Sequence, residues 1–222
     1  MLGRLGSKVL GATLRVLLGL GLAACALPSA DLVGGAGPGG AGGQGGSDAC
    51  PGAEAPLLLE PVADATLDEN DLATPHGDEL ELKVRSGDLL QRALLRFDLG
   101  GLPTASIICR ATLELTPVMP VSGPLEVGYH PVTTPWVEAL VTWGTQADAY
   151  GAESAHVLLE HDRMAPYYAD LTADARAMFA APSANFGWLV KARSEAGAPL
   201  STWVSARTGS SPPVLQILYS VP

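Results

Sequence analysis

The segment Gln91–Leu115 reads QRALLRFDLGGLPTASIICRATLEL and contains two stretches in which apolar and polar residues alternate. In the first stretch, one face of an extended chain carries Ala93, Leu95, Phe97 and Leu99. The other face carries Arg92, Arg96 and Asp98, with Leu94 as the apolar exception. A period of two residues is typical of a half-buried β-strand. We therefore predict a strand whose apolar face points into the core.

The second stretch has the same period and is separated from the first by turn residues. Its apolar positions are Ile107, Cys109, Ala111, Leu113 and Leu115, and its polar positions are Arg110, Thr112 and Glu114. Gly100, Gly101 and Pro103 supply the backbone freedom and the fixed φ angle that a chain reversal needs. The pattern predicts that the two stretches form a strand pair in an antiparallel sheet.

Short extended runs continue on both sides of this segment. We expect further strands at 56–60, 63–67, 80–85, 125–130, 187–192, 201–206 and 214–219. One helix is expected at 173–180, with Thr172 as N-cap, Asp174 in the first turn and Pro182 shortly after its end. Many short strands and one short helix indicate an all-β fold. We predict a two-sheet antiparallel β-sandwich, with a jelly roll as its commonest variant.

An ordered set of short blocks resembles the DNRLRE, or disaggregatase-related, domain family. The blocks are Arg92–Leu99, Leu102-Pro103, Ala111–Leu115, Asp64-Ala65-Thr66, Thr74-Pro75-His76-Gly77, Trp136-Val137-Glu138, Val141-Thr142-Trp143, Asp170-Leu171-Thr172, Asn185-Phe186-Gly187, Ser205-Ala206-Arg207 and Pro213-Val214-Leu215. The resemblance implies a secreted bacterial module, and some members resemble carbohydrate-binding modules. The chain departs from the pattern in three places. Pro75-His76-Gly77 replaces the usual Asn-Tyr-Gly, Arg207 takes an acidic position, and Pro212 replaces an arginine.

The first 24 residues are typical of an export signal. Three basic residues precede an apolar run at 16–22 that is too short to span a bilayer. The ending Leu22-Ala23-Ala24-Cys25 resembles a lipobox, so we predict cleavage before Cys25 and lipid attachment to its thiol. An ordinary signal peptide is the alternative. By resemblance to enteric lipoproteins, Ala26 favours the outer membrane or cell surface.

Residues 25–55 are rich in Gly, Ala and Pro, which is typical of a flexible tether. Residues 56–222 have the length of a single domain. If Cys25 is lipidated, Cys50 and Cys109 remain as an even pair in an oxidising compartment. A disulfide between them and two unpaired thiols are both open interpretations.

The net charge is strongly negative. The chain has 13 Lys and Arg residues against 23 Asp and Glu, and removal of residues 1–24 leaves 10 of the basic residues, so the mature net charge is −13. This charge argues against nucleic acid as a partner, because phosphate binding needs a basic surface. Calcium is a candidate structural ion, although no cofactor is required. Its candidate ligands are Asp64, Asp68, Asp71 and Asp170, with Glu69 and Asn70 in the same loop.

Sugar binding would require exposed aromatic rings beside hydrogen-bonding side chains. The candidates outside the structural blocks are Tyr129, Tyr150, Tyr167, Tyr168 and Trp188, whereas Trp136, Trp143 and Trp203 are expected in the core. His156 and His161 do not have the spacing of a zinc-binding histidine motif. Residues five apart also point to opposite faces of a strand, so the two side chains would not converge on a metal ion. We interpret Glu138 as a structural hydrogen-bonding acid rather than as half of a catalytic carboxylate pair.

The favoured function is that of a monomeric, surface-anchored, non-catalytic module that binds polysaccharide. A structural protein that packs against other envelope or matrix proteins is the second interpretation. A polysaccharide-active enzyme is the third. A row of exposed aromatic rings would favour the first, a broad apolar patch the second, and a pocket with two converging carboxylates the third.

Overall fold

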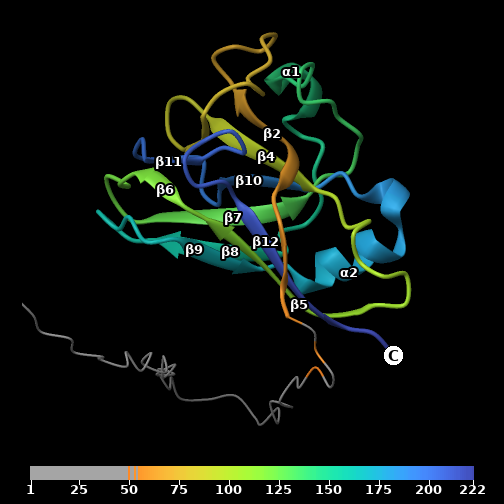
Figure 1. Cartoon of the computed structure of the whole chain (residues 1–222). Coiled ribbons are helices and arrows are strands. Elements are labelled where there is room, and N and C mark those ends of the chain that lie inside the picture. Colours follow the sequence, from red (N-terminus) through yellow and green to blue (C-terminus); the bar gives the residue numbers. More distant parts are fainter. Residues whose placement is uncertain (1–49, 51–52, 54) are drawn as a thin grey trace, which may run out of the picture. The chain divides into compact units, whose positions relative to one another are not determined.

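Two antiparallel sheets form the domain in a computed structural model that describes residues 50, 53 and 55–222 (Figure 1). The first sheet contains four strands in the order β1 (Leu57–Leu59), β12 (Val214–Ser220), β5 (Ile107–Leu115) and β9 (Tyr167–Asp170). The second contains β6 (Pro117–Met119), β11 (Ser201–Ser205), β3 (Glu81–Arg85), β4 (Gln91–Phe97), β10 (Trp188–Ala192), β7 (Leu125–Pro131) and β8 (Ala155–Leu159), with β2 (Pro61–Asp68) paired to β4. The predicted all-β sandwich is confirmed.

In the part of the chain that the structure describes, three short helical segments accompany the sheets. They are α1 (Trp143–Gln146), α2 (Thr172–Ala180) and the 3₁₀ segment η1 (Pro182–Ala184). Helix α2 packs against β5, whereas α1 contacts β2 (Figure 1). Among the residues that the structure describes, no helix is both long and apolar enough to cross a membrane. The predicted signal peptide, Cys25 and almost all of the predicted tether lie outside those residues.

The main core lies between the two sheets. Phe97 and Leu95 on β4 point into it, as predicted, and Phe97 meets Trp188 on β10 edge to face with ring centroids 6.1 Å apart. The indole nitrogen of Trp188 donates to the carboxylate of Asp174 on α2 at 2.8 Å. A buried tryptophan therefore keeps a hydrogen-bond partner, as the desolvation of its N–H group requires.

The predicted pairing of the two central strands is wrong. Strand β4 pairs with β2, β3 and β10 in one sheet, whereas β5 pairs with β12 and β9 in the other. The connection between them contains two successive turns, closed by Leu102 N to Leu99 O at 3.1 Å and Ser106 N to Pro103 O at 2.9 Å. It carries the chain across the core instead of folding it into a hairpin. Alternation shows that one face is buried, but it does not show whether two strands lie side by side or face each other.

A second core covers the outer face of the second sheet. Leu94 on β4 and Leu189 on β10 are fully buried there, together with Leu67 on β2. The covering side chains come from the segment Val132–Tyr150 and include Trp136. Leu94 broke the alternation of β4 for this reason: the strand is buried on both faces.

The start of α2 differs from the prediction. The helix already includes Thr172, and its hydroxyl accepts the backbone N–H of Ala111 on β5 at 3.0 Å instead of capping the helix. The N-cap residue is Leu171, and the carboxylate of Asp170 before it accepts the backbone N–H of Thr172 at 3.0 Å. These bonds hold α2 against β5.

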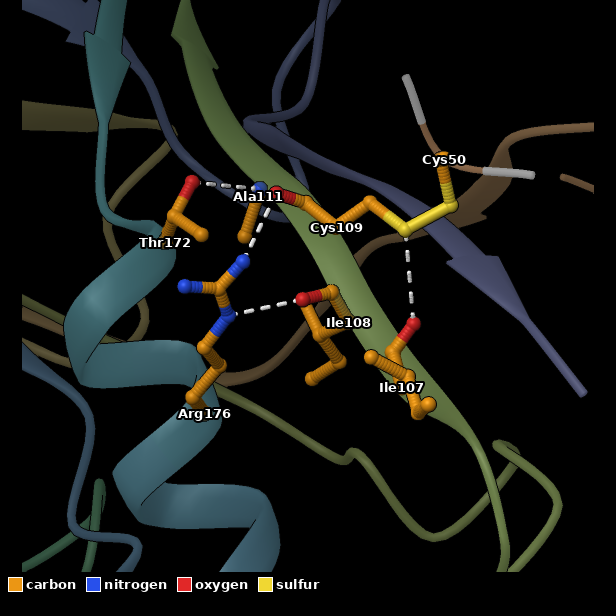
Figure 2. Close-up of a disulfide and its surroundings, with 7 residues drawn as sticks. All are labelled: Cys50, Ile107, Ile108, Cys109, Ala111, Thr172 and Arg176. Carbon is orange, nitrogen blue, oxygen red and sulfur yellow. Dashed lines mark hydrogen bonds between the residues drawn. A yellow bond between two sulfur atoms is a disulfide. The ribbon is translucent and has the colours of Figure 1, made fainter. Parts of the chain in front are cut away.

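A disulfide joins Cys50 to Cys109 on β5, with Cα atoms 5.7 Å apart (Figure 2). Arg176 from α2 lies beside it and donates to the carbonyl oxygens of Ile108 at 2.7 Å and Cys109 at 3.1 Å. The stretch just before β1 is thereby linked covalently to an inner strand of the first sheet.

Candidate ligand-binding face

Three of the five aromatic candidates for sugar binding are buried. Tyr129 on β7, Tyr167 on β9 and Trp188 on β10 are between 0% and 3% exposed and belong to the main core. Their rings point between the sheets, because each occupies an inward position of its strand. They cannot form an exposed stacking surface, so the prediction that they bind the ligand is wrong.

The other two candidates lie at the surface, on different sheets. Tyr168 on β9 is 54% exposed and stands on the first sheet opposite Glu114. Tyr150 is half-buried, pairs with Val132 through an isolated bridge and packs against the second core. Tyr150 lies beside the ring of His130 and the cationic groups of Arg92 and Lys191.

A cluster of rings and charges surrounds Arg92, which projects from β4 on its outer face. The guanidinium carbon lies 4.6 Å from the ring centroid of Trp143 and 5.6 Å from that of Tyr150. Arg92 is 5% exposed, and Glu195 holds it through two hydrogen bonds of 2.7 and 3.0 Å. Lys191 reaches the same carboxylate at 3.0 Å. We call these five residues the Arg92 cluster.

Within the Arg92 cluster, Arg92 and Lys191 share the carboxylate of Glu195. Burial alone would raise the pKa of Glu195, but the hydrogen bonds from Arg92 and Lys191 outweigh it and hold the pKa below its ordinary value. Arg92 also donates to the carbonyl of Ala147 and lies 3.5 Å from Asp148, which is fully exposed. The buried guanidinium thus fixes the two rings from below, and polar groups remain at the surface around them.

The segment Val132–Tyr150 sets the positions of both rings. Thr142 and Thr145 form a reciprocal capping box at the start of α1, which places Trp143 at the first helical position. Gln146 at the end of α1 donates to the carbonyl oxygen of Thr134 at 3.1 Å and so closes the segment on itself. Because both ends of this cover are tied down, the rings meet Arg92 in a defined geometry.

Sequence reasoning missed most of the Arg92 cluster. Trp143 was expected in the core, and Lys191 and Glu195 carried no motif. Arg92 did carry a signal. It lies on the same face of β4 as Leu94, and an apolar residue on that face indicates that other parts of the chain cover it. A basic residue next to a buried apolar residue on one face requires a partner.

A second charged group surrounds Asp64 in the middle of β2. Asp64 is 2% exposed, and its carboxylate accepts the backbone N–H of Arg207 at 2.5 Å. The guanidinium of Arg207 donates to both oxygens of Glu138 at 2.9 Å, and Glu138 accepts the backbone N–H of Asp64 at 3.1 Å. A pocket of about 530 Å³ opens above Glu138 and Arg207.

The two carboxylates of this group have opposite pKa shifts. Burial raises the pKa of Asp64 to about 6, and the neighbouring Glu138 adds to the effect. Burial also acts on Glu138, but the bonds from Arg207 and Asp64 outweigh it and lower its pKa. One guanidinium therefore neutralises Glu138 well and Asp64 poorly.

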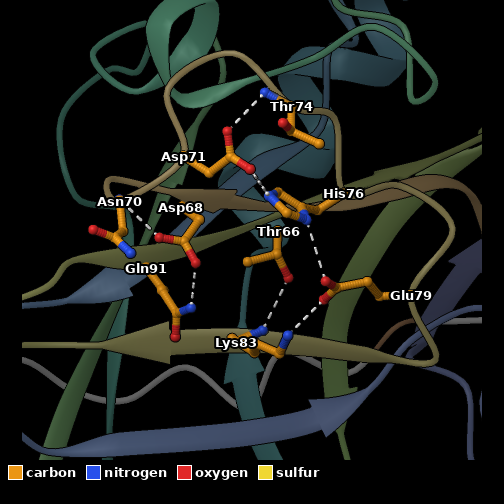
Figure 3. Close-up of polar contacts among 9 residues, drawn as sticks. All are labelled: Thr66, Asp68, Asn70, Asp71, Thr74, His76, Glu79, Lys83 and Gln91. Atoms are coloured by element: carbon orange, nitrogen blue, oxygen red, sulfur yellow. Dashed lines mark hydrogen bonds and ion pairs between the residues drawn. The ribbon is translucent and has the colours of Figure 1, made fainter.

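The remaining calcium candidates do not lie together. Asp68 accepts hydrogen bonds from the side chain of Gln91 at 2.7 Å and the backbone of Asn70 at 2.8 Å, and Asp71 accepts the backbone N–H of Thr74 at 3.2 Å (Figure 3). Asp170 lies in the other sheet. Within residues 50, 53 and 55–222, no three His, Cys, Asp or Glu side chains form a group that could hold a metal ion. The calcium site stays a prediction, which melting with and without chelator tests.

A cavity of about 840 Å³ lies between α2 and the connection from β4 to β5. Phe179 is its one aromatic lining residue, and the polar side chains of its lining are those of Asp98, Thr104, Ser106, Arg176 and Asn185. The carboxylate of Asp98 caps its own turn by accepting the backbone N–H of Gly100 at 2.8 Å. The cavity contains no second ring that could extend a stacking surface.

Comparison with known proteins gives one match to a family. The sequence pattern of carbohydrate-binding module family 96 matches residues 55–219, which include every strand of the domain except the last residue of β12. No curated protein matches the chain. Because the match extends over most of the chain, this protein belongs to carbohydrate-binding module family 96.

Proposed function

We propose that this chain is a non-catalytic module that binds polysaccharide through the surface around Tyr150 and Trp143. The observation that carries the proposal is the Arg92 cluster, in which two half-buried rings stand beside paired charges on the outer face of the second sheet. Membership of a carbohydrate-binding family supports it.

Polysaccharide recognition combines ring contacts with hydrogen bonds. The exposed parts of Tyr150 and Trp143 offer apolar surface to the C–H groups of a sugar ring. Lys191 and Asp148 offer a donor and an acceptor close by, and Arg92 keeps both rings in place. Because these groups are held before the ligand arrives, little conformational entropy is lost on binding.

Asp64 and Glu138 do not act as a catalytic pair in this proposed function. Glycoside hydrolysis requires one carboxylate that donates a proton and a second that attacks or activates water, with about 5 Å or more between them. Both carboxylates are instead bound by Arg207, which donates its backbone N–H to Asp64 and its guanidinium N–H to Glu138. Glu138 also accepts the backbone N–H of Asp64. Incubation with polysaccharide should release no new reducing ends. Release that Glu138→Gln abolishes would contradict the proposal.

Affinity gel electrophoresis tests binding. The full chain is run through gels that contain a neutral β-glucan, a xylan, a mannan or a polyuronate, and retardation gives a dissociation constant. We expect retardation by at least one polymer and at least tenfold weaker binding by Tyr150→Ala, on the scale of one lost stacking contact. Tyr168→Ala, on the other sheet, is the matched control and should bind like the wild type. Equal retardation of all three proteins would place the site elsewhere.

We also propose that a lipid on Cys25 holds the module at the outer membrane or cell surface, with residues 26–49 as a spacer and no requirement for a partner copy. Cys25→Ser should abolish incorporation of labelled palmitate and release the protein from the membrane fraction. Continued labelling of that variant would contradict anchoring through Cys25.

A further inference from the structure

The cavity of about 840 Å³ between α2 and the connection from β4 to β5 shares no lining residue with the Arg92 cluster. Its volume lies in the range that is typical of small-molecule sites. Most of its wall is apolar, with Leu99, Met178 and Phe179 among the lining residues. A concave and mainly apolar space with a few polar groups is the usual form of a ligand site, so this cavity is a candidate for a second one.

Hydrogen bonds hold the wall of the cavity in place. Asn185 donates to the carbonyl oxygen of Phe97, at the end of β4, at 2.9 Å. Arg176 on α2 donates to the carbonyl oxygens of Ile108 and Cys109 on β5 (Figure 2). The disulfide at Cys109 adds a covalent link beside these bonds. Because the wall is fixed before a ligand arrives, little conformational entropy would be lost on binding.

A carboxylate and a guanidinium line the cavity without pairing. Asp98 accepts the backbone N–H of Gly100 with Oδ1, and its Oδ2 has no hydrogen bond within the part of the chain that the structure describes. Arg176 donates through Nε and Nη2, which leaves Nη1 without a partner among the same residues. Both side chains are exposed, and no described group forms an ion pair with either of them within 4.0 Å. The lining therefore offers a free acceptor and a free donor.

Two further side chains in the lining have an oxygen without a partner. Ser106 Oγ and Asn185 Oδ1 are buried, and no described residue makes a hydrogen bond to either. Buried polar atoms normally have at least one hydrogen bond. The hydroxyl group of Ser106 can turn by rotation about one bond, so a donor that enters the cavity can satisfy it. The unsatisfied oxygens point to a ligand that carries hydrogen-bond donors.

The ring of Phe179 indicates which kind of ligand fits these groups. It is half-buried and is the one aromatic ring in the lining. An apolar ring among separate donors and acceptors suits a molecule with hydroxyl groups around a C–H face, which describes a sugar unit. Membership of a carbohydrate-binding family agrees with this ligand class. Because only one ring is present, the cavity suits a short sugar or the end of a chain and not a long run of polymer.

We propose that this cavity binds a neutral mono- or disaccharide unit at the end of a sugar chain. The C–H face of the terminal unit lies against Phe179, and its hydroxyl groups donate to Asp98 and Ser106 and accept from Arg176. The ligand is uncharged, because one carboxylate and one guanidinium are the charged side chains of the lining and leave no excess charge. This inference goes beyond the proposed function, since it concerns a separate site and a short ligand.

Isothermal titration calorimetry of the full chain with cellobiose, xylobiose and mannobiose tests the site. We expect at least one disaccharide to bind the wild type. Ala180→Trp should weaken this binding at least tenfold, because Ala180 lines the cavity and an indole there would occupy part of its volume. Ala177→Trp is the matched control, since Ala177 is exposed on the same helix and does not line the cavity, and it should bind normally. Circular dichroism should show that both variants remain folded.

A smaller change tests the polar contact and does not depend on the fate of a large side chain. Asp98→Asn retains an oxygen that can accept the N–H of Gly100 and replaces the free acceptor by a donor. It should weaken binding of the disaccharide about tenfold, the factor that corresponds to 1.4 kcal/mol, or about one hydrogen bond. Tyr150→Ala leaves the cavity unchanged and should bind the disaccharide like the wild type.

The outcomes separate this inference from the proposed function. If no disaccharide binds the wild type, or if Ala180→Trp and Asp98→Asn bind as well as the wild type, the cavity is not a sugar site and the surface around Tyr150 and Trp143 is unaffected. Loss of binding in Tyr150→Ala but not in Ala180→Trp would assign the short sugar to that surface and overturn the inference. If no polymer is retarded but Ala180→Trp abolishes disaccharide binding, the cavity site stands and the proposed function fails.

Glycine, titrated in the same way, tests the ligand class. A zwitterion could place its ammonium group at Asp98 and its carboxylate at Arg176, whereas a sugar uses neither contact as an ion pair. We expect no binding of glycine. Binding of glycine that Ala180→Trp abolishes would overturn the assignment to a sugar.

Discussion

At the residue scale, Arg207 links Glu138 to Asp64. Its guanidinium donates to both oxygens of Glu138 at 2.9 Å and lies 4.0 Å from a carboxylate oxygen of Asp64. The chain thus supplies its own cation between two acids that come from distant parts of the sequence. This arrangement leaves Asp64 as a buried carboxylate with an incomplete counter-charge.

The raised pKa of Asp64 predicts a specific pH dependence. A carboxyl whose pKa is higher in the folded state stabilises the fold at low pH and loses this contribution as the pH rises through its folded pKa, here about 6. Asp64→Asn mimics the neutral form at every pH. Its free energy of unfolding relative to the wild type should therefore increase between pH 5 and pH 7.5. Denaturant titrations at the two pH values measure this, and a difference that stays constant would show that Asp64 does not titrate in the window.

Removal of the Phe97 side chain should leave a cavity in the main core and lower the stability of the fold. Phe97 is 1% exposed and packs edge to face on Trp188, so Phe97→Ala should lower the free energy of unfolding by about 3–5 kcal/mol. Urea denaturation measures the loss. Tyr168→Ala removes an exposed ring from the other sheet and should cost less than about 1 kcal/mol. A Phe97→Ala protein that unfolds with the wild type would contradict the placement of β4.

At the element scale, the turn into β10 needs its glycine. Gly187 has φ of +79°, and a Cβ atom there would overlap the carbonyl oxygen of Leu95 on β4. Gly187→Ala should therefore destabilise the fold by about 2 kcal/mol or more, from left-handed strain together with the overlap. The same change at Gly101, where an added Cβ meets nothing, should cost less than about 1 kcal/mol. Thermal melting of the pair measures the difference, and equal melting temperatures would contradict the close approach.

Elements with a strong repeat of two could be predicted, whereas β9 and α1 could not. Strands β3, β7 and β12 were found within one residue of their ends. Strand β9 and helix α1 have only four residues each, too few for a period to show. The separation of β4 and β5 into different sheets could not be predicted either, because it depends on the packing of the nine residues between them.

The candidate face escaped sequence analysis for a related reason. Its members lie on β4, on β10 and the turn after it, and on the cover after β7, and only the pairing of β4 with β10 and the packing of the cover bring them together. Tyr150 was identified because it stood outside the structural blocks, but the same criterion also selected Trp188, which is fully buried. Aromatic type alone does not distinguish a stacking ring from a core ring.

At the scale of the whole molecule, the disulfide closes a long loop. Cys50 and Cys109 are 59 residues apart in sequence, and a cross-link over such a loop stabilises a fold by about 4 kcal/mol in the chain-entropy description. Reducing agent should lower the melting temperature of the wild type markedly. Cys50→Ser should show the lower melting temperature at once and no further response to the reductant. A response in the variant would mean that another bond is being reduced.

The same disulfide decides how a mechanical load would enter the domain. A pull applied to the chain before Cys50 reaches the inner strand β5 through the sulfur bridge, and bypasses β1, an edge strand of three residues paired only with β12. Without the bridge, the load would fall on β1 first and could peel it away one hydrogen bond at a time. Strand β5 is held by β12 on one side and β9 on the other, so it must be sheared out between two neighbours. If the proposed polymer binding and anchoring hold, a pull on the tether therefore acts on a strand that is held on both sides, and reduction of the disulfide would transfer the load to the edge strand β1.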